Sequence, residues 1–161
     1  MLLFHGSNMK VDKPKLMPNL QALDFGAGFY LTSSKEQAKK WARTVAKRRN
    51  MGQEIVNVYS FNEDFLQSLN VLTFPSADGK WLEYVVANRS SNMGKNDYDI
   101  VVGPVANDST LPVIDDYMAN KYTKEEAVKR LLPQNLTDQY AFLSEESIKL
   151  LEFVREEILC I

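Results

Sequence analysis

The spacing of apolar positions divides the chain into short strands and amphipathic helices. Residues 54–61 follow the alternation of a mostly buried strand, because successive side chains of a strand point to opposite faces. In residues 34–49 apolar side chains recur every three or four positions, which predicts a helix with one buried face, capped by Ser34. The pattern also predicts strands at 2–4, 29–32, 70–74, 99–102 and 139–143, and helices at 78–90, 110–120 and 123–132.

The remaining segments have weaker patterns. Residues 8–23 contain two prolines and few apolar periodicities, so they are expected to form a surface loop. Thr123, with Glu126 three residues later, predicts a capping box. A serine opens a helical turn over 144–149, whereas 150–159 fits either a last strand or a helix. This order of elements predicts an α+β fold with two small, mostly antiparallel sheets and flanking helices.

Composition limits the class of protein. With 161 residues, 45% of them hydrophobic, the chain is long enough for one well-buried core, so residues 1–161 are expected to form a single domain. A formal charge of −2 provides no global attraction to nucleic acid or to an acidic membrane. The only cysteine, Cys160, has no intramolecular partner, and the N-terminus lacks a basic run followed by a long apolar stretch. A cytoplasmic, reduced protein with no membrane span is predicted.

Residues 24–42 combine a glycine-bearing turn, a short strand and the start of a helix. Glycine at positions 26 and 28 lets the backbone adopt a positive φ or approach a bound group closely. Tyr30 lies on the strand and Trp41 on the apolar face of the helix, so the two rings can face the same space. This pairing favours a ligand site, although an aromatic on the apolar face of a helix fits a core position equally well.

Three short motifs, LLFHGS, DFGAGFYLTSS and YDIVVGPVAND, carry a family resemblance. The chain resembles the ADP-ribosyltransferase superfamily of the His-Tyr-Glu class, which includes poly-ADP-ribose polymerases and diphtheria-type toxins. It resembles more specifically a small bacterial family of uncharacterised domains within it. In that class an early strand carries His-Gly and a second strand carries Tyr, with another aromatic eleven residues on, as in His5-Gly6, Tyr30 and Trp41. The resemblance implies an ADP-ribosyltransferase-like split β-sheet with NAD as the bound substrate and no metal.

The resemblance also implies a role for each residue. His5 would hydrogen-bond a ribose hydroxyl of NAD, and Gly6 would bond the nicotinamide carboxamide through its backbone. Tyr30 and Trp41 would sandwich the nicotinamide ring by offset stacking. From the residues alone, a single histidine fits a structural side chain bonded to a backbone carbonyl just as well. The implied NAD-binding set is His5, Gly6, Ser7, Gly28, Phe29, Tyr30 and Trp41.

The third position of the signature departs from the family pattern. The superfamily has a glutamate at the start of a late strand, where this chain has Gln139. Glutamine keeps the acceptor for a ribose hydroxyl but loses the negative charge beside the oxocarbenium-like centre that forms as nicotinamide leaves. Asp138, Glu145 or Glu146 are candidates to supply that charge from nearby. The implied catalytic residues are therefore His5, Tyr30 and Gln139.

Two function hypotheses follow, one from the family resemblance and one from the replacement of the family glutamate by Gln139. The first is an NAD-dependent ADP-ribosyltransferase, a glycosyltransferase that moves ADP-ribose from NAD to a macromolecular acceptor, protein or nucleic acid. By analogy with small prokaryotic members, it is expected to be the toxin of a bacterial toxin–antitoxin pair, with a cognate antitoxin protein as partner. The second is a domain that binds NAD, ADP-ribose or a protein partner without turnover, as Gln139 allows.

Other patterns have weaker functional meaning. His5 is the only histidine, which removes any multi-histidine metal site, and the sequence has no GxSxG elbow and no phosphate-binding P-loop. Lys80, Trp81 and Arg89 fit the wall of a target groove, although core and surface positions explain them as well. Basic residues on the 34–49 helix fit either a solvated face or a phosphate contact. They are Lys35, Lys39, Lys40, Arg43, Lys47, Arg48 and Arg49.

Overall fold

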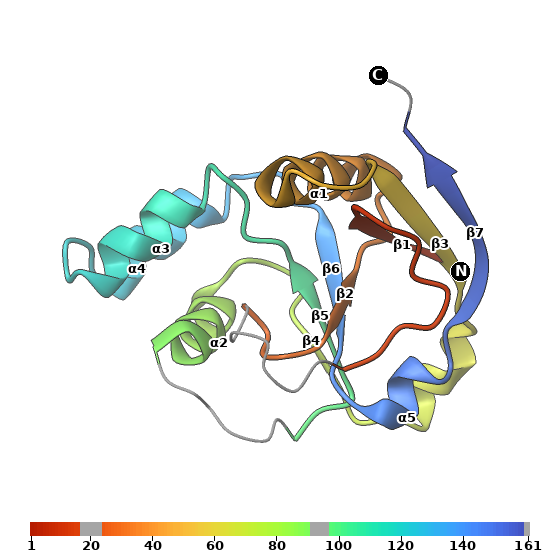
Figure 1. The fold of residues 1–161 in the computed structure, drawn as a ribbon. Coiled ribbons are helices and arrows are strands. Elements are labelled where there is room, and N and C mark those ends of the chain that lie inside the picture. Colours follow the sequence, from red (N-terminus) through yellow and green to blue (C-terminus); the bar gives the residue numbers. More distant parts are fainter. Residues whose placement is uncertain (17–23, 91–96, 160–161) are drawn as a thin grey trace.

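The protein has an α+β fold with two small, mostly antiparallel sheets, as the sequence predicts (Figure 1). The structure is a computed structural model that describes residues 1–16, 24–90 and 97–159. Part of the predicted 8–23 loop and Cys160 lie outside these residues. None of the helices in the described ranges combines the length and apolar character that crossing a bilayer requires.

The first sheet has three strands in the order β1-β3-β7. They are β1 (Leu2–Ser7), β3 (Ile55–Ser60) and β7 (Glu152–Ile158), and both pairings are antiparallel. The segment 150–159, which fits a strand or a helix by periodicity, therefore contains a strand. It forms the edge of the sheet because β3 offers it a partner that the local sequence does not reveal.

The second sheet has four strands in the order β2-β6-β5-β4. Strand β6 lies antiparallel between β2 and β5, and β4 joins β5 in parallel. One face of this sheet includes Tyr30 and Ala141, which pair directly across β2 and β6. Gln139 lies two residues before Ala141 on β6 and so belongs to the same face. The strands are β2 (Phe29–Leu31), β4 (Val71–Thr73), β5 (Ile100–Pro104) and β6 (Asp138–Phe142).

The two sheets meet at one point and then separate. Phe4 of β1 and Thr32, just after β2, exchange two backbone hydrogen bonds of 2.8 and 2.9 Å. A continued antiparallel ladder would next pair Gly6 with Tyr30, but there the Tyr30 carbonyl accepts a hydrogen bond from the His5 side chain instead. The sheets therefore split beside His5, Gly6 and Tyr30, where the sequence places its site.

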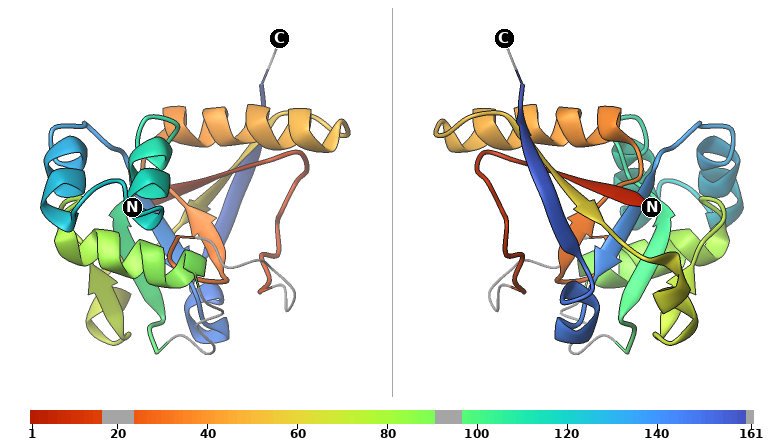
Figure 2. Two further views of the ribbon diagram at one scale, coloured as in Figure 1. Left: turned by 90° about the vertical axis from the view of Figure 1, so that its left-hand side faces the viewer. Right: turned by 90° about the vertical axis from the view of Figure 1, so that its right-hand side faces the viewer.

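Helix α1 (Lys35–Arg49) packs on β1 and lies across one end of the molecule (Figure 2). Ser34 caps it, since its side chain accepts a hydrogen bond from the Gln37 N–H at 3.2 Å. Ala38 and Ala42 are fully buried in the contact with the sheet. The predicted 34–49 helix is confirmed, and its small buried residues bring the helix close to β1.

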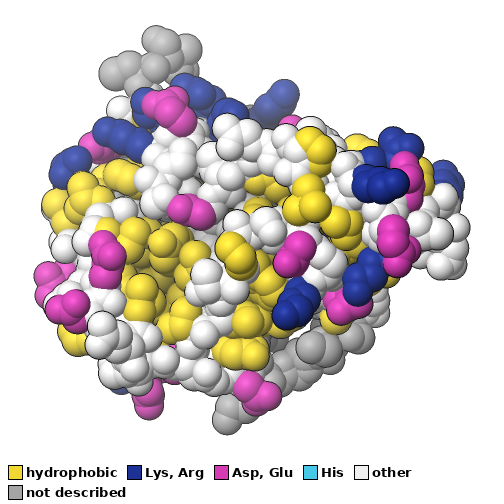
Figure 3. Space-filling view, turned by 180° about the vertical axis from the view of Figure 1, so that it is seen from behind, with side chains coloured by type: hydrophobic (Ala, Val, Ile, Leu, Met, Phe, Trp, Pro, Cys, Tyr) yellow, Lys and Arg dark blue, Asp and Glu magenta, His cyan; other side chains and the backbone are white. Residues whose placement is uncertain are grey.

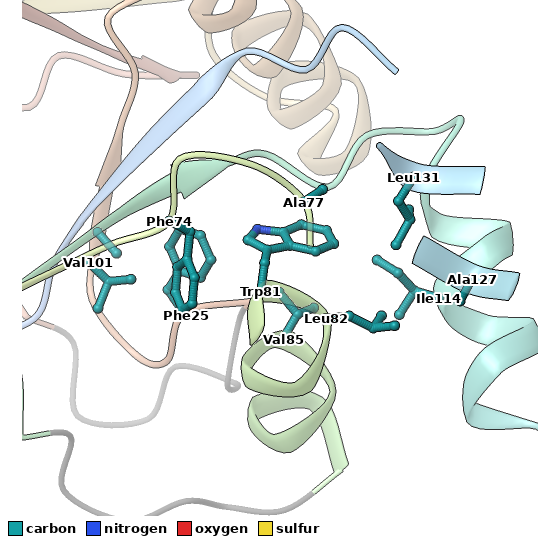
Figure 4. Close-up of a cluster of buried hydrophobic side chains, with 11 residues drawn as sticks. Phe25, Phe74, Ala77, Trp81, Leu82, Val85, Val101, Ile114, Ala127 and Leu131 are labelled. Carbon is teal, nitrogen blue, oxygen red and sulfur yellow. The ribbon is translucent and has the colours of Figure 1, made fainter. Parts of the chain in front are cut away.

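The remaining helices pack against the second sheet around Trp81. In the close-up, Phe25 and Phe74 lie on one side of its indole and Ile114 and Leu131 on the other (Figure 4). The Trp81 ring N–H donates to the Pro104 carbonyl at 3.0 Å. Trp81 is therefore a core residue, which was one of the alternatives to a groove wall that the sequence left open. These helices are α2 (Gly79–Ser90), α3 (Leu111–Met118) and α4 (Lys124–Leu131).

Two local details differ from the sequence expectations. Thr123 caps α4 through a bond from the Glu126 N–H, but the Glu126 carboxylate binds Arg130 rather than completing a capping box. Residues after the predicted 54–61 strand, for which no element was predicted, form a 3₁₀ helix, η1 (Glu63–Gln67), because the Asn62 side chain caps it. The predicted turn over 144–149 is α5 (Glu145–Ile148).

Large hydrophobic side chains also remain on the surface. On the face opposite to the view of Figure 1, hydrophobic side chains gather in a broad area interrupted by acidic ones, with basic side chains along its upper margin (Figure 3). Scattered exposed hydrophobic residues are normal on protein surfaces and do not by themselves indicate a ligand site. Those above one third exposed include Leu2, Met9, Met51, Phe65, Met118, Leu132, Val154 and Ile158.

Candidate functional site

A cavity of about 480 Å³ opens where the two sheets separate, beneath α1. Its size is typical of pockets that bind small molecules, and its wall combines apolar, aromatic and polar groups. The wall comes from β1, β2, α1, the end of α2, the segment after β5, the start of α3 and β6. Its residues are His5, Gly6, Asp24, Tyr30, Trp41, Thr44, Val45, Arg48, Arg89, Val105, Ala106, Leu111 and Gln139.

His5 is oriented by a hydrogen bond to the neighbouring strand. Its Nδ1 lies 2.7 Å from the Tyr30 carbonyl oxygen, and since a carbonyl only accepts, Nδ1 carries the hydrogen. The imidazole also stacks on Phe29, with ring centroids 4.2 Å apart. In the neutral ring the other nitrogen, Nε2, is an acceptor. Nε2 is therefore the one acceptor of the ring, and its chemistry suits a hydroxyl group.

The His5 imidazole is neutral at physiological pH. Burial lowers the pKa of His5 to about 4, while the hydrogen bond to the Tyr30 carbonyl opposes the shift and the charge of Arg49 adds to it. The expected ribose contact of His5 stays a prediction, and the structure shows two features of the residue. The side chain is bonded to a backbone carbonyl, as a structural histidine would be, and it also lines the cavity.

Gly6 contributes backbone groups to the cavity. The Phe4 N–H and C=O point away from β3 and bond Thr32. Because these groups alternate in direction along a strand, the N–H and C=O of Gly6, two residues later, also point away from β3. A side chain at position 6 does not fit, because an added Cβ would lie 2.1 Å from the Ala38 carbonyl oxygen. The glycine that was expected to let a ligand approach is thus also required by the packing of α1.

The Tyr30 hydroxyl has a structural task. It donates to the Gly26 carbonyl at 2.6 Å and accepts from the Phe25 N–H at 3.0 Å, which holds the turn before β2. Burial raises the pKa of Tyr30 and keeps the hydroxyl protonated as a donor. Its ring lines the cavity. Only the ring, and not the hydroxyl, is therefore available to a ligand.

Trp41 lines the cavity from α1 and belongs to none of the buried clusters of the described core. It is partly exposed, whereas Ala38 and Ala42 on the neighbouring side of the helix are fully buried. Thr44, Val45 and Arg48 follow it at three, four and seven positions, the spacing of one helical face. This face of α1 forms the cavity wall, so Trp41 is not a core residue.

Gln139 brings a buried amide into the wall. The side chain is 3% exposed, and its Nε2 is the one buried side-chain nitrogen or oxygen without a hydrogen-bond partner among the described residues. An unpaired buried amide group costs about 1–3 kcal/mol, which a bound acceptor would recover. Since Gln139 lies beside the cavity, this unpaired donor indicates a polar group of a ligand.

The neighbouring acidic residues do not supply a carboxylate to the wall. Asp138 accepts from the Ser33 N–H at 2.8 Å and from the hydroxyls of Thr32 and Ser33, so it ties β6 to the start of α1. Glu145 and Glu146 are exposed on α5, which follows the other end of β6. None of these three side chains lines the cavity, and a contribution of their charge beside Gln139 stays a prediction.

The charged groups of the wall are Asp24, Arg48 and Arg89. Arg89 pairs with Asp24 through two nitrogens, at 2.8 and 2.7 Å, and both side chains are largely buried. Arg48 is exposed and makes no ion pair with a described residue. The described residues contain no cluster of three or more His, Cys, Asp or Glu side chains suited to a metal. The one carboxylate in the wall is thus already neutralised.

The cavity brings together most, but not all, of the residues singled out from sequence. His5, Gly6, Tyr30, Trp41 and Gln139 converge on it from β1, β2, α1 and β6. The other three residues of the implied NAD-binding set do not line it. Ser7 lies further along β1, Gly28 abuts the Phe142 carbonyl, and Phe29 packs in the core on the opposite face of β2.

Several wall residues were missed from the sequence. Thr44 and Val45 share the helical spacing of Trp41 and could have been found from it, whereas Arg48 was already named as a candidate phosphate contact. The apolar residues after β5, Val105, Ala106 and Leu111, carry no local signal. Of the suggested groove residues, Arg89 does line the wall, whereas Trp81 is buried in the core and Lys80 is exposed.

The chain belongs to the family described as Protein of unknown function (DUF3990), whose model matches residues 1–153. The match spans every residue of the cavity wall. No curated protein and no solved structure matches the chain. Family membership therefore assigns no activity, and the function is argued from the residues of the cavity.

Proposed function

We propose that this chain is an NAD-dependent ADP-ribosyltransferase with an ADP-ribosyltransferase-like split sheet, which moves ADP-ribose to a macromolecular acceptor. One observation carries the proposal: residues matching the His, Gly, Tyr and aromatic positions of that superfamily line one cavity together with Gln139, whose buried amide lacks a partner. A coincidental motif match gives no reason for residues from four elements to converge.

The wall offers complementary groups to the nicotinamide riboside half of NAD. The neutral His5 ring presents an acceptor for a ribose hydroxyl, and the Gly6 backbone provides both a donor and an acceptor for a carboxamide. Tyr30 and Trp41 provide the aromatic faces on which a flat, electron-poor ring stacks, worth roughly 0.5–1.5 kcal/mol per pair.

In the proposed reaction the glycosidic bond between ribose C1′ and the nicotinamide nitrogen breaks, and its electron pair leaves with nicotinamide. A nucleophile of the acceptor then bonds to C1′ and releases its proton to solvent. Positive charge develops on the ribose during this exchange, and position 139 offers only the dipole of a neutral amide to stabilise it. A neutral amide stabilises such charge less than a carboxylate does, so a slow enzyme is expected.

The test is incubation of purified protein with NAD labelled in the adenosine half. Nicotinamide release is measured by chromatography, and label on protein and on nucleic acid is measured separately. We expect NAD binding by calorimetry, nicotinamide release, and loss of both in Trp41→Ala, whose partly exposed ring contributes little to folding. Lys129→Ala, on the exposed surface of α4, is the matched control. Absence of NAD binding to folded wild-type protein would refute the proposal.

A second candidate function is NAD or ADP-ribose binding, or binding of a protein partner, without turnover. This function is favoured because the cavity wall has no free carboxylate: Asp24 is paired with Arg89, and position 139 is neutral. Gln139→Glu separates the two functions. In an enzyme the added charge raises kcat several-fold with little change in affinity. If the chain is only a binding domain, neither the wild-type protein nor Gln139→Glu releases nicotinamide.

We further propose a toxin role, with a cognate antitoxin protein as partner, on the family resemblance alone. Expression in bacteria would then arrest growth, and the Trp41→Ala variant would be tolerated at equal protein level. Normal growth with soluble, NAD-hydrolysing wild-type protein would contradict the toxin role and leave the transferase activity intact.

A further inference from the structure

The seven basic residues of α1 differ in their partners. Three of the seven are neutralised by a carboxylate, and Arg49 instead donates a hydrogen bond to the Asn8 side-chain oxygen at 3.1 Å. The pairs are Lys35 with Glu157 at 2.6 Å, Lys39 with Glu36 at 2.8 Å, and Arg43 with Glu54 at 3.6 Å. These cations are explained by the stability of the fold and leave no charge for a partner.

Lys40, Lys47 and Arg48 make no ion pair with any residue that the structure describes, and all three are exposed. Arg48 lines the cavity, whereas Lys47 lies beside Arg43 along a separate hollow. Lys40, Thr44 and Lys47 follow one another at helical spacing, and Thr44 and Arg48 belong to the cavity wall. We call Lys40, Lys47 and Arg48 the basic row. Through Arg48, the basic row therefore meets the cavity wall.

We propose that the acceptor of the transferred ADP-ribose is a nucleic acid whose phosphates bind the basic row. This inference rests on the proposed function. One nucleotide would then lie at the cavity mouth, where a base nitrogen or a hydroxyl oxygen bonds to C1′ and loses its proton to solvent, while nicotinamide leaves with the electron pair of the broken bond. The net charge of −2 does not prevent nucleic-acid binding, because such binding needs only a local patch of positive charge.

Spacing and residue type favour a phosphate chain over a protein acceptor. Lys40 and Lys47 are separated by about 10 Å along the helix axis, which equals the rise of about three nucleotides of one strand. Lysine is depleted from protein interfaces, which centre on apolar anchors, whereas unpaired Lys and Arg are the usual contacts of phosphate oxygens. The basic row contains no apolar residue.

The experiment measures binding of fluorescent oligonucleotides by anisotropy at several salt concentrations. Single-stranded DNA, single-stranded RNA and duplex DNA of one mixed sequence identify which source of phosphates is preferred. The test variant is Lys40→Gln/Lys47→Gln, which spares the cavity wall. The matched control is Lys39→Gln/Arg43→Gln, with the same change of charge on the same helix.

We expect the Lys40→Gln/Lys47→Gln protein to bind at least about tenfold more weakly at low salt than the control. The slope of log affinity against log salt should fall by about 1.4 for a single strand, because each lost phosphate contact removes about 0.7. NAD affinity, measured by calorimetry, should be unchanged in both proteins. Equal weakening by both double variants would overturn the inference, as would wild-type protein that binds no oligonucleotide.

The result is distinguishable from a failure of the proposed function. Nicotinamide release without oligonucleotide binding, with label appearing on protein, would overturn the nucleic-acid acceptor and leave the transferase standing. Oligonucleotide binding through the basic row without NAD binding would refute the transferase and with it the acceptor assignment. Label on the preferred oligonucleotide, reduced in Lys40→Gln/Lys47→Gln, would support both.

Discussion

The two tryptophans show how one sequence pattern leads to two different environments. Both lie on a helix, among apolar residues at helical spacing. Trp81 is fully buried within a cluster of hydrophobic side chains, and its N–H is bonded to Pro104. Trp41 is partly exposed and borders a cavity. The difference lies in what faces each ring. Residues of α3 and α4 pack with Trp81, whereas Trp41 lies on the side of α1 that borders the cavity and not on the side that packs on β1.

Polar groups differ between the two regions in the same way. In the core, the Trp81 N–H has its acceptor. Around the cavity, the Gln139 amide nitrogen has no partner, and the Gly6 backbone faces the opening between the sheets. Unpaired groups lower the stability of the empty protein and raise the free energy available to a ligand. The comparison predicts that substitutions in the core reduce stability, whereas substitutions in the wall reduce binding.

The largest effect is expected from Trp81→Ala. Removing a fully buried indole leaves a cavity that the surrounding helices cannot close, which costs about 3–5 kcal/mol in the free energy of unfolding. Trp41→Ala is the matched comparison and should cost about 1 kcal/mol or less, because its ring is only partly covered. Urea denaturation measures both values. Equal losses in the two variants would show that the cavity side of α1 is packed like the core.

The next effect concerns the pH dependence of His5. With a folded-state pKa of about 4 against 6.5 when unfolded, the imidazole is neutral in both states above pH 6.5. Between these values only the unfolded chain binds the proton, so the stability contribution present above pH 6.5 is lost as the pH falls toward 4. The loss is up to about 3 kcal/mol.

Denaturation at a series of pH values should show this loss in wild type and a smaller one in His5→Asn, in which the carboxylates titrate as before. Because His5 is the only histidine, NMR detects its imidazole without overlap. Titration near pH 6.5 in the folded protein would contradict the prediction and place the ring in water.

Gly6→Ala should destabilise the protein by about 1–3 kcal/mol or more, because the new methyl group meets the backbone of α1 at Ala38. Gly79→Ala is the control. Its Cβ would meet only the flexible end of the Lys124 side chain, and alanine favours the helix, so stability should be equal or higher. Thermal unfolding ranks the two variants. A tolerated Gly6→Ala would mean that α1 shifts freely on β1.

The smallest change in stability is expected for Gln139→Met, which replaces a buried amide lacking a partner by an apolar side chain of similar size. Stability should stay within about 1 kcal/mol of wild type or rise, while NAD affinity falls. Asn57→Leu is the contrast. Its buried amide bonds Val11 and Met9, so stability should fall. A destabilised Gln139→Met would indicate that this amide supports the fold rather than a ligand.

Much of the secondary structure was predictable because its signals are local. The cap of α1 requires only Ser34 and Gln37, three residues apart, and its buried face follows from helical spacing. The last segment could not be assigned, since a strand at a sheet edge depends on its partner, here β3. Phe29 was misplaced for a related reason. It is adjacent to Tyr30, but neighbours on a strand point to opposite faces, and only the packing shows which face borders the cavity.

The sequence by itself determined the helices and strands and the chemical identity of His5, Tyr30, Trp41 and Gln139, because these follow from residue type and short-range spacing. Only the tertiary structure decided that the sheets separate beside Gly6. It also decided that the Asp138 carboxylate accepts a hydrogen bond from Thr32, 106 positions earlier in the sequence, and that Arg89 neutralises Asp24. Contacts between distant residues depend on how whole elements pack, and no local pattern of side chains encodes that choice.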